Sequence, residues 1–432
     1  MATVTQGAQA KAVPRGEQAM SVSAARAAML DAVTPVARTE IVQIKAALGR
    51  VLADNVHARV NVPPHDNSAM DGYAFDGQAL AQAARTGAAL VLQVAGTALA
   101  GSAWRAPVGA GQCVKIMTGA VMPSGLDTVV PQEMVVQEAP DRIRLPLGQI
   151  RAGDNRRLAG EDLRRGHPAL RRGERLGPAA CGLIASLGLG QVEVVRRLRV
   201  AYFSTGNEIL SLGEAPREGA VYDSNRYTVR ALLQRLGCTF IDLGVVRDEP
   251  ALLEAAFTQA AAQADAIITS GGVSVGEADL TRQLMKQLGD VAFWRIAMRP
   301  GRPMAAGRIH PPGQPPAVLF GLPGNPVAVM VTFLAFVRPA LLRMMGARPQ
   351  LPVLLRARST QTLRKKPGRT EYQRGIVRAG EHGELEVSIT GNQGSGVLSS
   401  MVQANGLIVL HHDQGTAAAG DWVDVLMFDG VI

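Results

Sequence analysis

Short apolar runs alternate with helical patterns between residues 198 and 347, and this rhythm restricts the possible folds more than any other feature of the 432-residue chain. Runs that are apolar throughout are typical of parallel strands buried on both faces of a sheet. We predict strands at residues 200–203, 239–243, 266–269, 291–294 and 317–320, and helices at 225–236, 249–262, 279–288 and 326–345. The rhythm therefore predicts a doubly wound α/β domain over residues 198–349.

Polar residues and glycines follow these predicted strands. Ligands of doubly wound sheets bind in a crevice beyond the carboxyl ends of the strands. We expect that crevice to collect Ser204, Thr205, Gly206, Asn207, Glu208, Asp248, Gly271, Gly272, Gly324 and Asn325. Two of them also fit simple capping roles. Asp248 precedes Pro250 as a helix N-cap would, and Asn325 can cap a helix that starts at Pro326, leaving N–H groups free for an anion.

The loop after the predicted strand at 266–269 carries the most suggestive chemistry. Gly271 and Gly272 permit a sharp turn that presents N–H groups to an anion. Glu277 and Asp279 follow where the next helix should begin, and a phosphate beside two carboxylates requires a divalent cation between them. The pattern suggests a metal-assisted phosphate site. A Gly-rich turn with an Asp N-cap explains the same residues and remains open, because the loop matches neither a Walker loop nor G-x-G-x-x-G.

Three arginines follow the predicted strand at 291–294, in the segment WRIAMRPGRP. They are Arg295, Arg299 and Arg302. Their guanidinium groups stay charged, and each presents a fork of donors that matches phosphate or another oxyanion. We predict that this segment binds an anion beside the acidic site.

Residues 48–159 consist of short β-type pieces separated by glycine and proline, and they predict a small β-rich domain. Its segment VPPHDNSAMDGYA must be a loop because of Pro63 and Pro64, and its aspartates, Asp66 and Asp71, serve either a surface site or the capping of turns. Thr118 ends a predicted strand, where its hydroxyl could bind an anion or only cap a turn.

The remaining segments complete a multidomain prediction. Residues 1–19 are polar and predict a disordered tail. Helical patterns at 20–47 and 160–197 bracket the β-rich domain and predict one discontinuous helical linker domain. From residue 350 to 432 apolar and polar residues alternate between turns, which predicts a C-terminal β-barrel.

Composition narrows the class of function. The net charge of +9 favours anionic partners, but the arginines are scattered in pairs and aromatics make up only 4%, which argues against a nucleic-acid binder. The apolar run at 326–342 contains Arg338-Pro339 and is shorter than a membrane span requires, so we predict a buried helix and no membrane segment. Three distant cysteines without a C-x-x-C pair indicate a cytoplasmic protein.

Taken together, the segments resemble the molybdopterin molybdenumtransferase family, which completes molybdenum-cofactor biosynthesis and is related to the C-terminal domain of gephyrin. The resemblance is carried by PPHDNSAMDGYA (63–74), IMTGAVMP (116–123), RRLAGEDLRRG (156–166), FSTGNEIL (203–210), YDSNRY (222–227), TSGGVSVGEADL (269–280), FWRIAMRPGRP (293–303), GLPGNPV (321–327) and GRTEYQRG (368–375). These motifs cover nearly the whole chain from about residue 20, in the order of the family.

The resemblance implies a reaction and a set of site residues. Adenylylated molybdopterin and molybdate would react with the help of Mg²⁺ to give molybdenum cofactor and AMP, in a homodimer whose active site combines two subunits. The implied catalytic residues are Asp71, Thr118, Glu208, Asp248, Asp279, Arg295 and Arg299, of which Glu208, Asp248 and Asp279 would hold the metal. The implied substrate or molybdate ligands are Ser270, Gly271, Gly272, Ser274, Arg302, Gly324, Asn325, Arg374 and Ser395.

Two departures and three alternatives accompany this resemblance. The family often has lysine at positions 295, 299 and 302, and arginine cannot donate its proton at neutral pH. Asn207 stands where the family often has aspartate, which makes Glu208 the better metal ligand. The alternatives are a molybdopterin adenylyltransferase, a gephyrin-like scaffold or cofactor carrier, and a nucleic-acid binder. Contacts with molybdopterin adenylyltransferase and with molybdoenzyme-maturation proteins are further implications of the resemblance.

Overall fold

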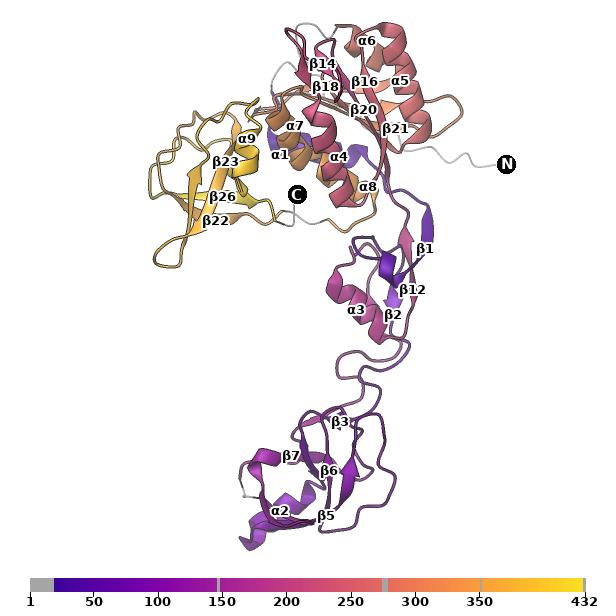
Figure 1. Ribbon diagram of the computed structural model, residues 1–432, viewed down its shortest axis with the longest axis vertical. Helices are drawn as coiled ribbons and strands as arrows, with labels where there is room; N and C mark the ends of the chain where they lie inside the picture. Colours follow the sequence, from indigo (N-terminus) through magenta and orange to yellow (C-terminus); the bar gives the residue numbers. More distant parts are fainter. Residues whose placement is uncertain (1–18, 146–147, 274–278, 350–351, 430–432) are drawn as a thin grey trace, which may run out of the picture.

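The computed structural model describes residues 19–145, 148–273, 279–349 and 352–429. Figure 1 shows an elongated molecule. An α/β domain and a small barrel lie side by side at one end, a β-rich domain lies at the other, and a narrow linker joins them. The chain passes through the linker twice, because the β-rich domain is inserted between its two halves.

The α/β domain is built on a six-stranded sheet with the order β16-β13-β17-β21-β20-β18. Its strands are β13 (Arg199–Thr205), β16 (Thr239–Val246), β17 (Ala266–Ser270), β18 (Gly289–Arg295), β20 (Pro303–Ile309) and β21 (Ala317–Leu322), and its helices include α4 (Ser224–Leu236), α5 (Pro250–Gln263) and α6 (Asp279–Leu288). Successive residues of β13 enter opposite cores: Tyr202 packs with α4, and Phe203 packs with α5. The predicted doubly wound fold is confirmed, with both faces of the sheet covered.

One strand of this sheet was absent from the prediction. β20 lies between β18 and β21 and runs antiparallel to both. Its sequence is rich in alanine and glycine, which disfavour strands locally. A Cβ at Gly307 would stand 2.1 Å from the Asp290 carbonyl oxygen, so only a residue without a side chain fits that pairing. Tertiary packing against two neighbouring strands therefore overrides the local preference.

The predicted helix at 326–345 is formed by α7 (Pro326–Thr332), a π-helical turn (Phe333–Val337) and α8 (Arg338–Met344). Pro339 does not interrupt it, because the wider π turn accommodates a residue that lacks the N–H donor. By length and composition this helix could cross a membrane, but 72% of its most apolar window is buried inside the protein. Its buried side chains belong to the largest hydrophobic cluster among the described residues.

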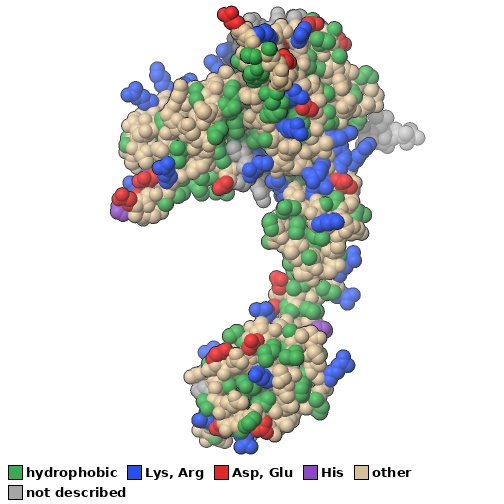
Figure 2. Space-filling model, viewed as in Figure 1, with side chains coloured by type: hydrophobic (Ala, Val, Ile, Leu, Met, Phe, Trp, Pro, Cys, Tyr) green, Lys and Arg blue, Asp and Glu red, His purple; other side chains and the backbone are tan. Residues whose placement is uncertain are grey.

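The linker contains more strand than the predicted helical domain. β1 (Thr39–Gln43) pairs with β12 (Gln191–Val195), and β2 (Val56–His57) pairs with β11 (Pro168–Leu170), beside α3 (Pro178–Ser186). The helix expected within 20–47 is α1 (Val22–Ala32), which packs against the π-helical turn and α8 of the α/β domain. Arg196 of the linker holds Asp265 of the α/β domain through two contacts of 2.8 and 2.6 Å. Lys and Arg side chains gather at this joint in Figure 2.

The two remaining domains are the β-rich insert and the barrel. The insert contains β3 (Asn67–Ser68), β4 (Gly72–Phe75), α2 (Gln78–Thr86), β5 (Leu90–Ala98), β6 (Gln112–Ile116), β7 (Thr128–Pro131), β8 (Val136–Ala139), β9 (Arg142–Leu145) and β10 (Arg156–Arg157). The barrel contains β22 (Leu355–Ser359), β23 (Thr370–Ala379), β24 (Leu385–Ile389), α9 (Ser399–Gln403), β25 (Gly406–Leu410) and β26 (Trp422–Met427). Pairing between β23 and β25 closes the barrel, as predicted.

Candidate active site at the strand ends

Two loops at the carboxyl ends of β13 and β16 carry the predicted acidic residues. The last paired residues of these strands are Thr205 and Val246. Beyond them, the Asn207 side-chain oxygen accepts the Asp248 N–H at 3.3 Å, which ties the two loops together. Glu208 and Asp248 are both exposed. The carboxyl edge of the sheet therefore carries two exposed carboxylates on neighbouring loops.

The Gly271-Gly272 turn follows β17 at the same edge of the sheet. The φ angles of the two glycines are +99° and +66°, a region that other residues rarely adopt. A Cβ at Gly271 would lie 2.4 Å from the Thr205 carbonyl oxygen, so close approach to β13 also requires glycine. The Gly271 N–H donates to the Leu322 carbonyl at 3.2 Å. That donor serves the fold, which differs from the expected cradle in which it would face an anion.

Two residues at the start of α4 were missed as site residues, although both lie within the YDSNRY motif. Asp223 caps α4, and burial raises the pKa of its carboxyl group. Asn225 contacts both Ser270 and the backbone of Gly324, each at 2.7 Å. An Asp-Ser-Asn sequence before a helical pattern is a capping signal, which made these residues look purely structural. Only the fold shows that Asn225 reaches the residue directly before the glycine turn.

The three predicted arginines belong to the connection between β18 and β20, and all three are exposed. Arg295 ends β18, and Arg299 lies in β19 (Met298–Arg299). β18 and β21 each run antiparallel to β20, so Arg295 lies at the same edge of the sheet as the glycine turn. The Arg295 carbonyl accepts the Met20 N–H at 2.8 Å, and β19 pairs with β23 of the barrel. The arginine segment is thus held on both sides by backbone contacts.

Arg374 and Ser395 occupy the seam between the barrel and the α/β domain. Arg374 is only 1% exposed, and its guanidinium group donates to Ser400 Oγ at 2.9 Å and to the Gly394 carbonyl at 2.9 Å. Burial and the positive charge of Arg299 both lower the pKa of Arg374. These contacts make Arg374 part of the barrel's own structure, and its expected contact with an anion remains a prediction.

The start of α7 differs in detail from the prediction. Asn325 stands at the N-cap position, but its side chain makes no capping hydrogen bond. The Val327 N–H, expected to be free for an anion, donates to the Ser395 carbonyl at 3.1 Å. The barrel therefore takes up one of the donors that the helix start would otherwise offer.

Asp71 and Thr118 lie together in the β-rich domain. Asp71 Oδ1 accepts hydrogen bonds from the Thr118 N–H and from the Thr118 hydroxyl, each at 2.7 Å. These bonds, the backbone bond first, lower the pKa of the exposed Asp71 carboxyl group. Figure 1 shows that this domain, marked by β3 and β6, lies at the opposite end of the molecule from β16 and β21. One chain does not bring the two halves of the predicted site together.

Part of the predicted metal site lies outside the described residues. Glu277 and the predicted substrate ligand Ser274 are outside them, and for Asp279 only the position at the start of α6 is described. Among the side chains that the structure does describe, no group of three His, Cys, Asp or Glu has the arrangement of a metal site. Glu208 and Asp248 are the members of the predicted metal set that can be placed.

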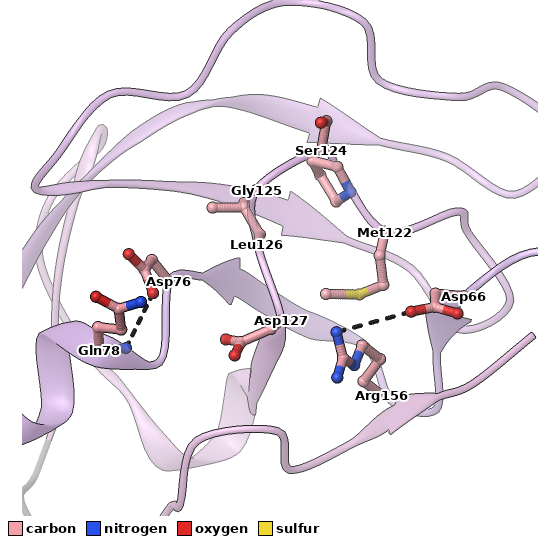
Figure 3. A pocket seen from close by; sticks show the side chains of 10 residues that line it. Asp66, Asp76, Gln78, Met122, Ser124, Gly125, Leu126, Asp127 and Arg156 are labelled. Carbon is pink, nitrogen blue, oxygen red and sulfur yellow. Dashed lines mark hydrogen bonds and ion pairs between the residues drawn. The ribbon is translucent and has the colours of Figure 1, made fainter.

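A cavity of about 450 Å³ lies in the β-rich domain, away from these residues. Figure 3 shows Asp66, Asp76 and Asp127 around it, with Arg156 3.7 Å from Asp66. Asp66, which the sequence analysis left open between a surface site and turn capping, is among its lining residues, whereas none of the residues implied by the family resemblance is. Its carboxylates already accept hydrogen bonds from the Ala159, Gln78 and Gly77 N–H groups, so they serve the local fold.

Comparison with known families covers most of the chain. Residues 20–188 match the MoeA N-terminal region (domain I and II), residues 201–343 match a probable molybdopterin binding domain, and residues 356–428 match the MoeA C-terminal region (domain IV). The three matches follow the linker and insert, the α/β domain and the barrel.

Whole proteins give the same result. A molybdopterin molybdenumtransferase of Haemophilus influenzae is 39% identical over 96% of this chain and 100% of its own length. One from a Nostoc species is 37% identical over 90% of this chain and 88% of its own length. The crystal structure of the molybdopterin biosynthesis moeA protein from Pyrococcus horikoshii has a TM-score of 0.79 and 27% identity, and covers 95% of this chain and 100% of its own. The chain therefore belongs to the molybdopterin molybdenumtransferase family.

Proposed function

We propose that this transferase inserts molybdate into adenylylated molybdopterin and releases AMP. Family membership supports the insertion of molybdenum, since relatives named for it match along the whole chain. The observation that carries the finer proposal is the edge of the α/β sheet. Carboxylates, a glycine turn and an arginine segment lie there, a set that suits a phosphate-bearing substrate and an oxyanion. The matches to the insert and the barrel disfavour an adenylyltransferase, whose fold would correspond to residues 198–347 alone.

The acidic loops suit a divalent cation. Glu208 and Asp248 offer exposed carboxylate oxygens, the ligand type that Mg²⁺ prefers, and Asp279 at the start of α6 would add a third. A bound Mg²⁺ would neutralise charge on the phosphates as AMP leaves. Because Asn207 Oδ1 holds the Asp248 N–H, the two loops keep their spacing before the substrate arrives.

The arginine segment suits molybdate and phosphate. Arg295, Arg299 and Arg302 are exposed and permanently charged, so they would bind and orient anions but could not supply a proton at neutral pH. No nucleophile of the protein is needed. Positioning of the two substrates and neutralisation of their charge would be enough to promote the reaction.

Two chains would be needed for the complete site. The Asp71–Thr118 pair belongs to the β-rich domain, which lies far from the α/β crevice of its own chain (Figure 1). We propose a homodimer in which this pair reaches the crevice of the partner subunit.

We also propose a cytoplasmic location and transient contacts with molybdopterin adenylyltransferase and molybdoenzyme-maturation proteins. Cys113, Cys181 and Cys238 are free thiols in the described structure, which suits a reducing compartment. Contact with the preceding and following enzymes would shield a reactive pterin from solvent.

The direct test is an assay of AMP release and of molybdenum-cofactor formation with adenylylated molybdopterin, molybdate and Mg²⁺. We expect activity from the wild type and a loss of at least tenfold in Asp248→Asn. Asp290→Asn is the matched control: this aspartate is equally acidic in type but lies near the other end of β18, paired with His310. Tight pterin binding without AMP release from the wild type would instead indicate a cofactor carrier.

A further inference from the structure

Asn225 occupies an unusual place for an asparagine. It lies in the first turn of α4 and is only 9% exposed. The helix begins where it does because Asp223 Oδ1 accepts the Arg226 N–H at 3.1 Å, while the Asp223 N–H donates to the Leu210 carbonyl at 2.9 Å. These contacts fix the first turn of the helix, and with it the direction of the Asn225 side chain toward the sheet.

The Asn225 amide joins two separate loops. Its Nδ2 donates to Ser270 Oγ and to the Gly324 carbonyl, each at 2.7 Å. Ser270 is the last residue of β17, directly before the glycine turn, and Gly324 lies between β21 and α7. One side chain thus uses its donors on both loops.

These two loops need such a connection. The ladder between β17 and β21 ends with the pair Ser270 and Leu322, so the strands diverge at that point. Beyond it, the Gly271 N–H bonds back to Leu322, and the amide of Asn225 reaches past the ladder to Gly324. A buried amide that is satisfied on both donors holds its partners rigidly, because breaking either bond would leave a buried polar group unpaired.

The Asn225 side-chain oxygen adds a second observation. It is buried and has no hydrogen-bond partner among the described residues. Most buried polar side-chain atoms in folded proteins have a hydrogen-bond partner, so this oxygen is available to accept a bond from a water molecule or a ligand.

We propose that Asn225 is a positioning residue that sets the spacing between the Gly271-Gly272 turn and the Gly324 loop, so that both contact the phosphate-bearing part of molybdopterin. The identity of that ligand rests on the proposed function. The tie between the loops is a property of the free protein.

The test compares Asn225→Ala and the isosteric Asn225→Asp with Asn405→Ala. Asn405 is a matched control because its side chain also makes two bonds, to the Val377 N–H at 2.7 Å and the Val377 carbonyl at 2.9 Å, but within the barrel. Three quantities are measured: amide hydrogen exchange of the free protein at residues 270–273 and 322–325, the Kd for molybdopterin, and KM and kcat for AMP release.

We expect both Asn225 variants to speed exchange at the two loops and to raise Kd and KM at least tenfold, with kcat changed less than threefold. Asn405→Ala should lower the Tm and leave Kd unchanged. Adding Ser270→Ala to the Asn225→Ala variant should raise Kd by a smaller factor than Ser270→Ala does in the wild type, because the bond between the two residues is already lost.

Wild-type exchange rates at both loops in the Asn225 variants would overturn the proposal, as would faster exchange with an unchanged Kd. An equal rise of Kd in Asn405→Ala would show that reduced stability alone weakens binding, and this result would also overturn the proposal. If the wild type itself neither binds molybdopterin nor releases AMP, the proposed function fails, and hydrogen exchange alone decides whether Asn225 holds the loops.

Discussion

At the scale of single residues, the same side-chain type serves quite different purposes in this protein. Arg295 at the sheet edge and Arg299 in β19 are exposed, whereas Arg374 is buried and bonded to the barrel. Hydrogen bonds from Thr118 lower the pKa of the exposed Asp71 carboxyl group, whereas burial raises the pKa of Asp223. The environment decides each role, because hydrogen bonds stabilise a charge and desolvation opposes it.

The Asp71–Thr118 pair predicts a change in titration. Thr118→Val removes the hydroxyl donor, so we expect the pKa of Asp71 to rise toward its ordinary value of 3.8. In the wild type the pKa is depressed, so the favourable contribution of the charged form is present above the ordinary pKa and lost as pH falls through the depressed one. Carboxyl-carbon NMR titration measures this directly. Identical titration of the two proteins would show that the hydroxyl bond contributes nothing.

Substitution of Arg374 separates a structural role from a binding role. Arg374→Met should lower the free energy of unfolding by on the order of 3 kcal/mol, because buried carbonyl groups lose their donor. Chemical denaturation checks it, with Arg378→Met, on the exposed part of β23, as the control. A variant of unchanged stability that no longer binds molybdate would instead assign Arg374 directly to the anion.

At the scale of elements, glycines and strand ends shape the site. The turn after β17 passes so close to β13 that it cannot carry a side chain at Gly271. The barrel contributes by pairing β23 with β19 and by meeting the start of α7 through Ser395. The crevice is therefore assembled from loops that are held by different elements, and its shape depends on their contacts.

Gly271→Ala tests the close approach of the turn to β13. Gly313→Ala is the matched control, since Gly313 also has a positive φ, of +67°, but a Cβ there meets nothing within 4 Å. The control should lose about 1–2 kcal/mol of stability from backbone strain alone. The Gly271→Ala variant should lose clearly more stability than the control and should also bind molybdopterin more weakly, because the backbone at Thr205 must move away from the new Cβ. Thermal unfolding and a binding titration measure both effects, and equal losses would argue against the clash.

At the scale of the whole molecule, the distance between domains determines what one chain can do alone. The linker holds the β-rich domain far from the α/β domain, although the predicted catalytic residues belong to both (Figures 1 and 2). A symmetric dimer solves this problem if each insert reaches the partner's crevice.

Subunit mixing tests that arrangement. Asp71→Ala and Asp248→Ala should each be inactive. If the site combines two subunits, equal mixing with subunit exchange should restore roughly a quarter of the wild-type activity, because half of the dimers are mixed and each has one intact site. A mixture that stays inactive after verified exchange would place the whole site within one chain.

The chain's own sequence determined the elements with local signals. The rhythm of apolar runs and helices between 198 and 347, the alternation after 350 and the glycine turn at 271–272 all predict what the structure contains, because strand burial, helix periodicity and positive φ depend on nearby residues. Spacing did not show that Asp71 and Thr118 act in one site: the resemblance to a family implied it, and the structure shows their hydrogen bonds.

Only the tertiary structure decided the contacts between distant segments. It places the alanine-rich β20 in the sheet and buries Arg374. It also packs α1 into the α/β core, although the sequence analysis assigned that segment to the linker. It also brought Asn225 of α4 under two loops that follow β17 and β21. These outcomes depend on partners far along the chain, whose packing and hydrogen bonds outweigh local preference, and no local pattern records which partner will be met.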